Sequence, residues 1–273
     1  MTPSDEDINL FRERVWSFYR KKGRHDLPWR ATSNPYDILV SEVMLQQTQV
    51  SRCLARYPEF IRIFPDFPTL AAAPLADLLR VWKGMGYNRR AIALKTTAEL
   101  VISRYQGHLP REESELRKCP GIGKATAASI VAFAYNGRVI FIETNIRRVF
   151  IHCFFPGMTM VPDRTIYPLV SATLDPENPR EWYYALMDLG ATLAKTVQNP
   201  NRRSAHYCRQ TRFQGSSRQI RGKILSLLTE SDTITLESLT DHVGGDPEKI
   251  KFIVLALEKE GFLVTEGNSV HIR

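Results

Sequence analysis

Hydrophobic residues recur every three or four positions along most of this chain, and that spacing predicts amphipathic helices. The segments with this spacing cover residues 5–21, 36–56, 75–82, 91–104 and 126–135, and residues 112–118 are also helix-like. Asn34 and Pro35 are typical of a helix cap and first turn. Strand-like alternation is nearly absent before the last residues, so the pattern predicts a mainly α protein.

The C-terminal part has its own pattern, which begins after a Gly/Ser linker at residues 214–217. Short helices are expected at residues 220–228, 236–243 and 247–260, the last with Asp246 as its cap and Pro247 at its first position. Two apolar runs on either side of a turn at residues 266–268 then predict a hairpin. Three helices followed by a hairpin indicate a winged-helix module.

Composition indicates a well-packed protein, because 273 residues with 43% hydrophobic content can form two or three domains. The sequence holds no apolar run of membrane-span length, and its first residues lack signal-peptide character. We therefore expect an intracellular, cytoplasmic protein. The four cysteines are scattered without disulfide or metal-ligand spacing, so reduced thiols are expected.

Charge is distributed unevenly along the chain, although the net value is +8. Residues 216–273 hold seven basic and nine acidic residues, and the remaining 30 basic and 20 acidic residues give +10 before them. Residues 195–223 contain eight Lys or Arg and no Asp or Glu. Such a run is either a solvated surface or a contact for phosphate, and its interleaved His, Tyr and Phe residues favour phosphate contact.

A glycine turn lies between two helix-like segments, at Gly121 and Gly123. Such a turn aims backbone N–H groups at the start of the next helix, where they can bind a phosphate, and Lys124 adds a cation. An ordinary helix-to-helix turn is the alternative. Because Glu42, Gln46 and Gln49 share one face of the helix expected at residues 36–56, they indicate either a polar pocket or an exposed polar stripe.

Several short motifs occur in an order that resembles MutY-type adenine DNA glycosylases, of the helix-hairpin-helix glycosylase superfamily. They are Leu27-Pro28-Trp29-Arg30, Pro35-Tyr36, residues 41–50, Gly84-Met85-Gly86-Tyr87, Pro120-Gly121-Ile122-Gly123 and Met187-Asp188-Leu189-Gly190. The resemblance covers residues 8–195. It implies a mainly α fold, in which a two-domain helix-hairpin-helix glycosylase body carries the small α+β winged-helix module.

The implied domains are a discontinuous helical domain of residues 1–33 and 136–215, a six-helix barrel of residues 34–135, and the winged-helix module of residues 216–273. DNA would lie across the groove between the first two. Because a base inside a duplex is out of reach, the target nucleotide would be flipped into a pocket.

Two carboxylates carry the chemistry that the resemblance implies. Glu42 matches the acid that protonates the adenine ring, which requires a raised pKa. Glu143 falls at the position of the catalytic aspartate that stabilises the cationic sugar, and Asn145 matches an asparagine beside it. Gln46, Gln47, Tyr87 and Asn88 are candidates for filling the gap or reading the opposite strand, or else they pack inside the barrel.

Three departures from the family pattern change this expectation. Glu143 is one methylene longer than aspartate, which can displace a carboxylate and slow the reaction. After Gly190 the chain has only Cys208, so the four thiolates of the family's iron–sulfur cluster are missing and we expect no metal and no cofactor. The basic segment, with Arg202 and Arg203, would keep the phosphate contact. The larger Nudix-like domain is replaced by the winged-helix candidate, which binds DNA, contacts protein or packs on the body.

The sequence therefore predicts a monomeric, monofunctional DNA glycosylase of base excision repair. Its substrate would be double-stranded DNA with a mispaired purine, most simply adenine opposite 8-oxoguanine or guanine, and its C-terminal module could bind a protein partner. Three alternatives stay open, namely a glycosylase for another damaged or modified base, a bifunctional lyase that uses Lys124, and a non-catalytic reader of mismatched or damaged DNA. The usual lyase position holds Ala125, which favours the hydrolase.

Overall fold

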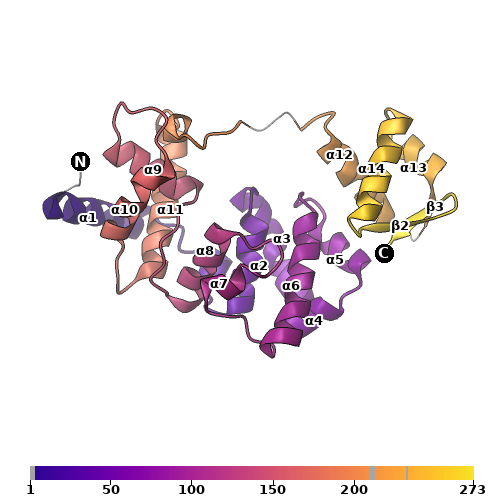
Figure 1. Ribbon diagram of the computed structural model, residues 1–273, viewed down its shortest axis with the longest axis horizontal. Coiled ribbons are helices and arrows are strands. Elements are labelled where there is room, and N and C mark those ends of the chain that lie inside the picture. Colours follow the sequence, from indigo (N-terminus) through magenta and orange to yellow (C-terminus); the bar gives the residue numbers. More distant parts are fainter. Residues whose placement is uncertain (1–3, 210–212, 232) are drawn as a thin grey trace. The chain divides into compact units, whose positions relative to one another are not determined.

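The computed structural model describes residues 4–209, 213–231 and 233–273, and most of them lie in helices (Figure 1). The chain divides into two compact units. Unit 1 contains residues 1–42, 109–118 and 122–209, and unit 2 contains residues 43–108, 119–121 and 210–273. The predicted three-part division at residues 33, 135 and 215 stays a prediction.

Unit 1 is a bundle around the long helix α11. Its elements are α1 (Asp5–Lys22), the turn η1 (Pro28–Arg30), most of α2 (Pro35–Leu45), α7 (Glu113–Leu116), α8 (Lys124–Tyr135), α9 (Thr144–Phe154), α10 (Asp163–Thr173), α11 (Pro179–Thr196) and the turn η2 (Pro200–Arg203). Helix α11 packs against α9, α1 and α8. Phe11 of α1, Phe150 of α9 and Trp182 of α11 form an aromatic cluster in this core, with Phe11 and Phe150 ring centroids 5.3 Å apart.

Unit 2 joins a helical layer to the C-terminal module. Its helices are α3 (Val50–Ile63), α4 (Phe67–Ala72), α5 (Leu75–Trp82), α6 (Arg89–Tyr105), α12 (Ser217–Leu228), α13 (Leu236–Val243) and α14 (Pro247–Lys259). Its strands are β1 (Ile234–Thr235), β2 (Leu263–Glu266) and β3 (Ser269–Ile272). Phe60 of α3 packs against Trp82 of α5 in the core, and both side chains are fully buried.

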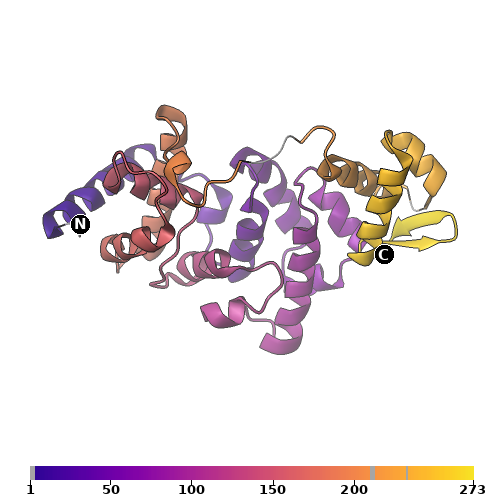
Figure 2. The ribbon, with the colours of Figure 1, turned by 45° about the horizontal axis from the view of Figure 1, so that its top comes forward.

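The C-terminal module confirms the predicted winged-helix pattern. Helices α13 and α14 have the expected residues within one position, and Asp246 caps α14 by accepting a hydrogen bond from the backbone N–H of Glu248. Strands β2 and β3 form the hairpin of the wing (Figures 1 and 2). The sequence pattern missed β1, which pairs with β3 in the order β1-β3-β2, because a two-residue strand is too short to show alternation.

The helix predicted at residues 36–56 was wrong, because the chain breaks between α2 and α3. Residues 46–49 form a turn in which Gln47 has a φ of 53°, in the left-handed region. A distant side chain stabilises this turn, because the buried guanidinium of Arg90 donates hydrogen bonds to the carbonyls of Val43, Met44 and Gln46. Gln46 therefore does not continue the helical face of Glu42.

Other predicted helices are confirmed with small shifts at their ends. The helix expected at residues 75–82 matches α5, and those at 91–104 and 126–135 each begin two residues earlier as α6 and α8. The four cysteines are free thiols. Over the residues that the structure describes, none of the helices is both long and apolar enough to cross a membrane.

Candidate active site and DNA-contacting loops

Glu42 lies on α2, beside side chains that anchor this helix in the core. Val40 and Val43 are buried on either side of it, and the carboxyl group of Glu42 faces α8, where the Ser129 hydroxyl donates to its Oε2 at 2.5 Å. Burial raises the pKa of Glu42 to about 7 from an ordinary value of 4.5, although the Ser129 hydrogen bond acts in the opposite direction. A carboxyl group with this pKa is protonated in about half of the molecules at pH 7, so it can serve as a general acid.

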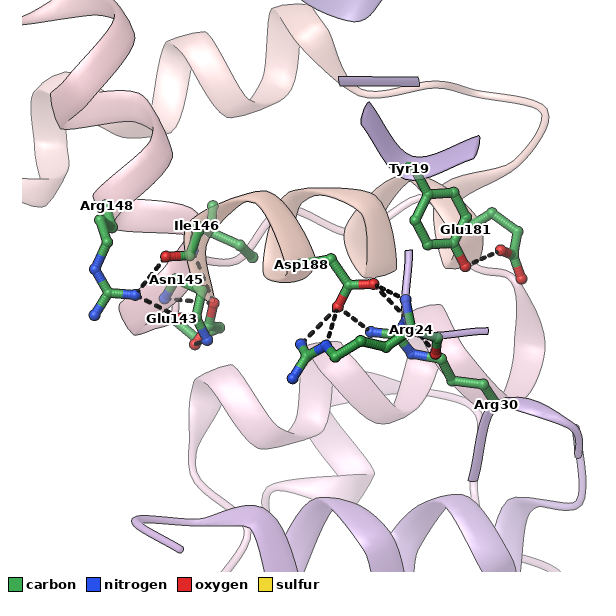
Figure 3. Close-up of polar contacts among 10 residues, drawn as sticks. Tyr19, Arg24, Arg30, Glu143, Asn145, Ile146, Arg148, Glu181 and Asp188 are labelled. Carbon is green, nitrogen blue, oxygen red and sulfur yellow. Dashed lines mark hydrogen bonds and ion pairs between the residues drawn. The ribbon is translucent and has the colours of Figure 1, made fainter. Parts of the chain in front are cut away.

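Glu143 is the N-cap of α9. Its Oε1 accepts hydrogen bonds from the backbone N–H groups of Asn145 (2.6 Å) and Ile146 (2.7 Å), and its Oε2 accepts from the Asn145 side-chain amide (3.2 Å; Figure 3). Burial raises the pKa of Glu143, whereas these backbone donors and the guanidinium groups of Arg148 and Arg147 favour the ionised form. The longer side chain curls back onto its own helix, so it caps α9 as a shorter aspartate would.

The hydrogen-bond partners of Glu42 and Glu143 favour different protonation states. Glu143 meets only N–H donors in these hydrogen bonds, and a carboxylate is the form that accepts all of them. Glu42 meets a hydroxyl group, which can donate to the carboxylate or accept from the neutral acid. Glu42 is therefore the group suited to hold a proton, and Glu143 the group suited to stay charged.

The Met187-Asp188-Leu189-Gly190 motif lets the loop of Glu143 pack closely against α11. A Cβ atom at Gly190 would lie 2.4 Å from the backbone oxygen of Asn145, so only glycine permits this close approach. The Gly190 carbonyl accepts a hydrogen bond from Arg148 at 2.8 Å, and the same guanidinium nitrogen donates to the Asn145 side chain at 2.7 Å. The glycine and the arginine thereby fix the orientation of the asparagine that contacts Glu143.

Asp188 of the same motif holds the Leu27-Pro28-Trp29-Arg30 motif. Its buried carboxylate accepts from the backbone N–H and Nε of Arg24, each at 2.7 Å, and from both terminal nitrogens of Arg30 at 2.8 Å (Figure 3). These cations hold the pKa of Asp188 below its ordinary value although burial opposes them. The Arg30 guanidinium also lies 4.4 Å from the centroid of the Tyr184 ring. Two motifs far apart in sequence therefore form one buried ion-pair cluster.

The basic segment after α11 is attached to α9 by side-chain hydrogen bonds. Asn199 Oδ1 accepts from Arg148 Nε at 3.1 Å, and the Asn201 amide donates to the carbonyl of Thr144 at 2.9 Å. Arg203 donates to the Ile151 and Phe155 carbonyls at the end of α9. Within the described residues, no group of His, Cys, Asp or Glu side chains is arranged to hold a metal ion. The residues present therefore do not fit an iron–sulfur cluster.

The predicted gap-filling residues lie in two loops that one arginine holds together. Arg90 donates to the end of α2 and to the turn of residues 46–49, and also to the Met85 and Gly86 carbonyls of the Gly84–Tyr87 loop, at 3.1 and 3.0 Å. Tyr87 has a φ of 46° and is 40% exposed, while Asn88 is the N-cap of α6. Sequence reasoning missed Arg90, because nothing in its local pattern separates a buried arginine from a solvated one.

The glycine turn before α8 has one glycine that the backbone requires. Gly121 has a φ of 76°, whereas Gly123 has an ordinary φ and open space where a Cβ would lie. Gly123 is the N-cap of α8 and makes no side-chain cap hydrogen bond, and the N-terminus of a helix favours an anion. Lys124 is exposed, with its Nζ 5.2 Å from the centroid of the Tyr167 ring. The Gln46 amide donates to the Gly121 carbonyl at 3.1 Å.

The remaining predicted DNA contacts fall into two groups. Arg202 is exposed and stays a candidate for phosphate contact. Arg203 is engaged with the carbonyls of α9, and a role in DNA binding stays a prediction for it. Arg209 and Lys195 are exposed in the basic segment, and Arg212 lies outside the described residues.

A helical body, a glycine turn before α8 and two buried carboxyl groups are the features expected of the helix-hairpin-helix class of DNA glycosylases. Comparison of the fold agrees, because a thermostable thymine-DNA glycosylase superposes with a TM-score of 0.63 at 24% identity, covering 72% of this chain and 91% of that one. An endonuclease III in a DNA complex gives a TM-score of 0.57 at 18% identity, covering 68% and 85%. Residues 40–165 match the HhH-GPD superfamily of base excision DNA repair proteins.

Sequence comparison identifies the family within that class. The adenine DNA glycosylase of Mycolicibacterium smegmatis is 36% identical over 238 residues, which are 81% of this chain and 81% of that protein. The Mycobacterium tuberculosis protein is 34% identical and covers 83% and 79%. The chain belongs to the adenine DNA glycosylase family. The adenine DNA glycosylase of Buchnera aphidicola is another relative, 35% identical over 67% of this chain. The match covers 53% of the Buchnera protein, so the chain spans about half the length of that relative.

Proposed function

We propose that this protein is a monofunctional DNA glycosylase that hydrolyses the N-glycosidic bond of a mispaired adenine. The observation that carries the proposal is the pair of carboxyl groups in unit 1, because one has a pKa of about 7 and the other lies on a helix N-terminus among N–H donors. Membership of the adenine DNA glycosylase family supports the choice of base. Adenine opposite guanine or 8-oxoguanine in double-stranded DNA is the proposed substrate.

The proposed reaction begins with proton transfer from the Glu42 carboxyl group to a ring nitrogen of the extruded adenine. Protonation makes the base a better leaving group, so the bond between the sugar carbon and the base breaks and its electron pair leaves with the base. The Glu143 carboxylate then stabilises the positive charge on the sugar. Water then adds to the sugar carbon and gives one proton to a carboxylate. The products are free adenine and an abasic site.

Hydrolysis is favoured over a lyase reaction by the residues at the start of α8. A lyase needs an amine nucleophile at the sugar, and the position that resembles the lyase lysine is Ala125. Lys124 packs over the Tyr167 ring. Borohydride reduction tests this distinction, because a lyase forms a Schiff base that borohydride traps on DNA, whereas the proposed hydrolase gives no covalent product.

The substrate is tested by single-turnover base release with purified protein. Duplexes carry adenine opposite guanine, 8-oxoguanine or cytosine, beside hypoxanthine, uracil and thymine mispairs. Release of adenine opposite guanine or 8-oxoguanine supports the proposal, and release of another base would keep the mechanism but replace the substrate. Binding to mismatched duplexes with no release of any base would instead assign a reader without catalysis.

A further inference from the structure

Lys124 has a preferred position, although it is exposed at the start of α8. Its Nζ lies 5.2 Å from the centroid of the Tyr167 ring on α10. The face of an aromatic ring carries partial negative charge, so it attracts an ammonium group above it. Tyr167 is half-buried, and its ring therefore offers Lys124 a fixed surface.

An ion pair one helical turn earlier fixes this part of α10. Asp163 precedes Tyr167 by four residues, so both side chains lie on one face of α10. The two carboxylate oxygens of Asp163 accept hydrogen bonds from the Arg147 guanidinium of α9, each at 2.7 Å. The Arg147 and Asp163 side chains are only 17% and 22% exposed. Because a bidentate pair is among the stronger hydrogen-bonded contacts, it holds the Tyr167 face of α10 against α9.

Arg147 connects the same face of α10 to Glu143. It follows Glu143, the N-cap of α9, by four residues. The Asp163 hydrogen bonds raise the pKa of Arg147 although burial opposes them, and the nearby Glu143 and Tyr167 groups add to the rise. Asp163 and Tyr167 of α10 therefore meet the starts of two helices, α9 with Glu143 and α8 with Lys124.

The proposed reaction needs these two helix starts in a fixed relation. A DNA phosphate bound by Lys124 at the start of α8 would fix the position of the flipped sugar beside it. Glu143 must meet that sugar, and a displacement of about an ångström can cost on the order of a hundredfold in rate. A side chain that ties Lys124 to the packing of α10 on α9 would therefore affect the rate as well as the affinity for DNA.

We propose that Tyr167 is a positioning residue, which holds the Lys124 ammonium group over its ring and so aligns the phosphate beside the target nucleotide with Glu143. The inference rests on the proposed function, because it names the residue that orders one DNA contact of that site. A tyrosine that only fills space on α10 would matter equally with and without Lys124. The two roles therefore differ in whether the Tyr167 and Lys124 substitutions act independently.

A double-mutant cycle in the full chain measures this coupling. The variants are Tyr167→Leu, Lys124→Ala and their combination, and the probe is a duplex with a tetrahydrofuran abasic analogue opposite guanine. Lys124→Ala should bind about tenfold more weakly, and the slope of its salt dependence should fall by about one. Tyr167→Leu should weaken binding by about threefold when Lys124 is present and by less than about 1.5-fold when it is not.

Fluorinated side chains separate the ring face from packing. Tyr167→Phe keeps the aromatic face and should bind like the wild type. Analogues of that phenylalanine with two and four ring fluorines keep nearly the same shape but withdraw negative charge from the face, so affinity should fall stepwise. The steps should vanish in the Lys124→Ala background. The control Tyr105→Leu removes a half-buried tyrosine, whose ring centroid lies 5.6 Å from the Arg104 guanidinium, and should leave the affinity unchanged.

The rate tests the alignment with Glu143. At saturating protein, Tyr167→Leu should release base about tenfold more slowly than the wild type, and Tyr167→Phe should be as fast. An unchanged rate for Tyr167→Leu, equal effects on binding in both backgrounds, or affinities that ignore the fluorine series would overturn the inference. The binding readouts need no catalysis. Coupling of Tyr167 to Lys124 in a wild-type protein that releases no base would therefore contradict the proposed function and leave this DNA contact standing.

Discussion

Ser129 gives Glu42 a hydrogen-bond partner in either protonation state. Its hydroxyl donates to the carboxylate, and its Oγ also lies 3.0 Å from the Thr126 carbonyl. When Glu42 is protonated, the acid can donate to Ser129 while the serine proton turns to Thr126. Glu42 can therefore lose its proton to a substrate without becoming an unpaired buried charge.

The rate of base release should depend on the proton of Glu42. Because burial raises the pKa of Glu42 to about 7, the single-turnover rate should fall as the pH rises above about 7. The Ser129 hydrogen bond lowers this pKa, so Ser129→Ala should move the fall to higher pH. Ser103→Ala removes a similar helix hydroxyl elsewhere and should leave the profile unchanged. A profile unaffected by Ser129→Ala would remove the serine from this role.

Glu42 should also reduce stability at alkaline pH. A carboxyl group whose pKa is raised in the folded state costs stability as the pH rises from its unfolded value, 4.5, through the folded value of about 7. A rise of this size corresponds to about 3 kcal/mol, so Glu42→Gln should raise the free energy of unfolding by about that amount at pH 8. The gain should vanish below pH 4.5. Denaturant titrations that show the same gain at pH 4 and pH 8 would contradict this assignment.

The turn η2 supports α9 at both of its ends. Asn201 binds the Thr144 carbonyl at its start, and Arg203 binds carbonyls at its end. Asn199 contacts Arg148, which in turn orients Asn145 against Glu143. A short polar segment therefore stabilises the loop of Glu143 by hydrogen bonds.

Loss of one of these contacts should slow the reaction without weakening DNA binding. Asn201→Ala frees the Thr144 carbonyl beside Glu143, and a small displacement of the carboxylate should lower the single-turnover rate by about ten- to a hundredfold. Binding to the tetrahydrofuran duplex should change by less than about threefold. The neighbouring variant Arg202→Ala should bind DNA more weakly, and its affinity should depend less on salt concentration. Its single-turnover rate at saturating protein should be unchanged. Equal effects of both variants on binding would contradict the assignment.

Sequence patterns predicted the helices that are determined by residues close to them in the sequence. The apolar spacing of α5 and the Asp246-Pro247 start of α14 were sufficient to place these helices. The turn at residues 46–49 depends on Arg90, more than 40 residues away, so no local window contains its cause. The resemblance located Glu42, Glu143 and Asn145, and the structure places them in the same compact unit.

The supporting residues could not be found in the same way. Asn199 sits in a polar loop, and its partner Arg148 looks like any cation on a helix until the fold brings them within 3.1 Å. The chemical groups of the candidate site could be proposed from the sequence because motifs mark them, and their roles stay predictions. The sequence did not predict what positions these groups, because that depends on distances between segments.

At the scale of the whole molecule, acidic residues of the C-terminal module form ion pairs that hold it against other parts of unit 2. Glu230 pairs with Lys83, the C-cap of α5, and Glu260 pairs with Arg89, the first residue of α6. The Thr229 carbonyl also accepts from Arg80 at 3.3 Å. Within unit 2 the module therefore packs on the helical layer, and packing was one of the three roles that its sequence allowed.

Removing Glu260 should loosen this packing. Arg89 and Arg221 lower the pKa of Glu260 to about 2, so its contribution should persist until strongly acidic pH. Glu260→Ala should lower the free energy of unfolding by about 1 kcal/mol, since the pairs are partly solvated, and should increase hydrogen exchange in α12. The exposed Glu248→Ala is the matched control. Exchange that is unchanged in α12 would show that other contacts hold the module.

The central claim is that Glu42 and Glu143 together break the glycosidic bond, one as the acid and one as the charged partner of the sugar. The most direct measurement is single-turnover adenine release by the wild type, Glu42→Gln and Glu143→Gln, beside their affinity for the tetrahydrofuran duplex. The wild type should release adenine, and each variant should lose on the order of a thousandfold in rate while its affinity stays within about threefold. Release that survives in Glu143→Gln, or affinity lost in step with the rate, would contradict the account.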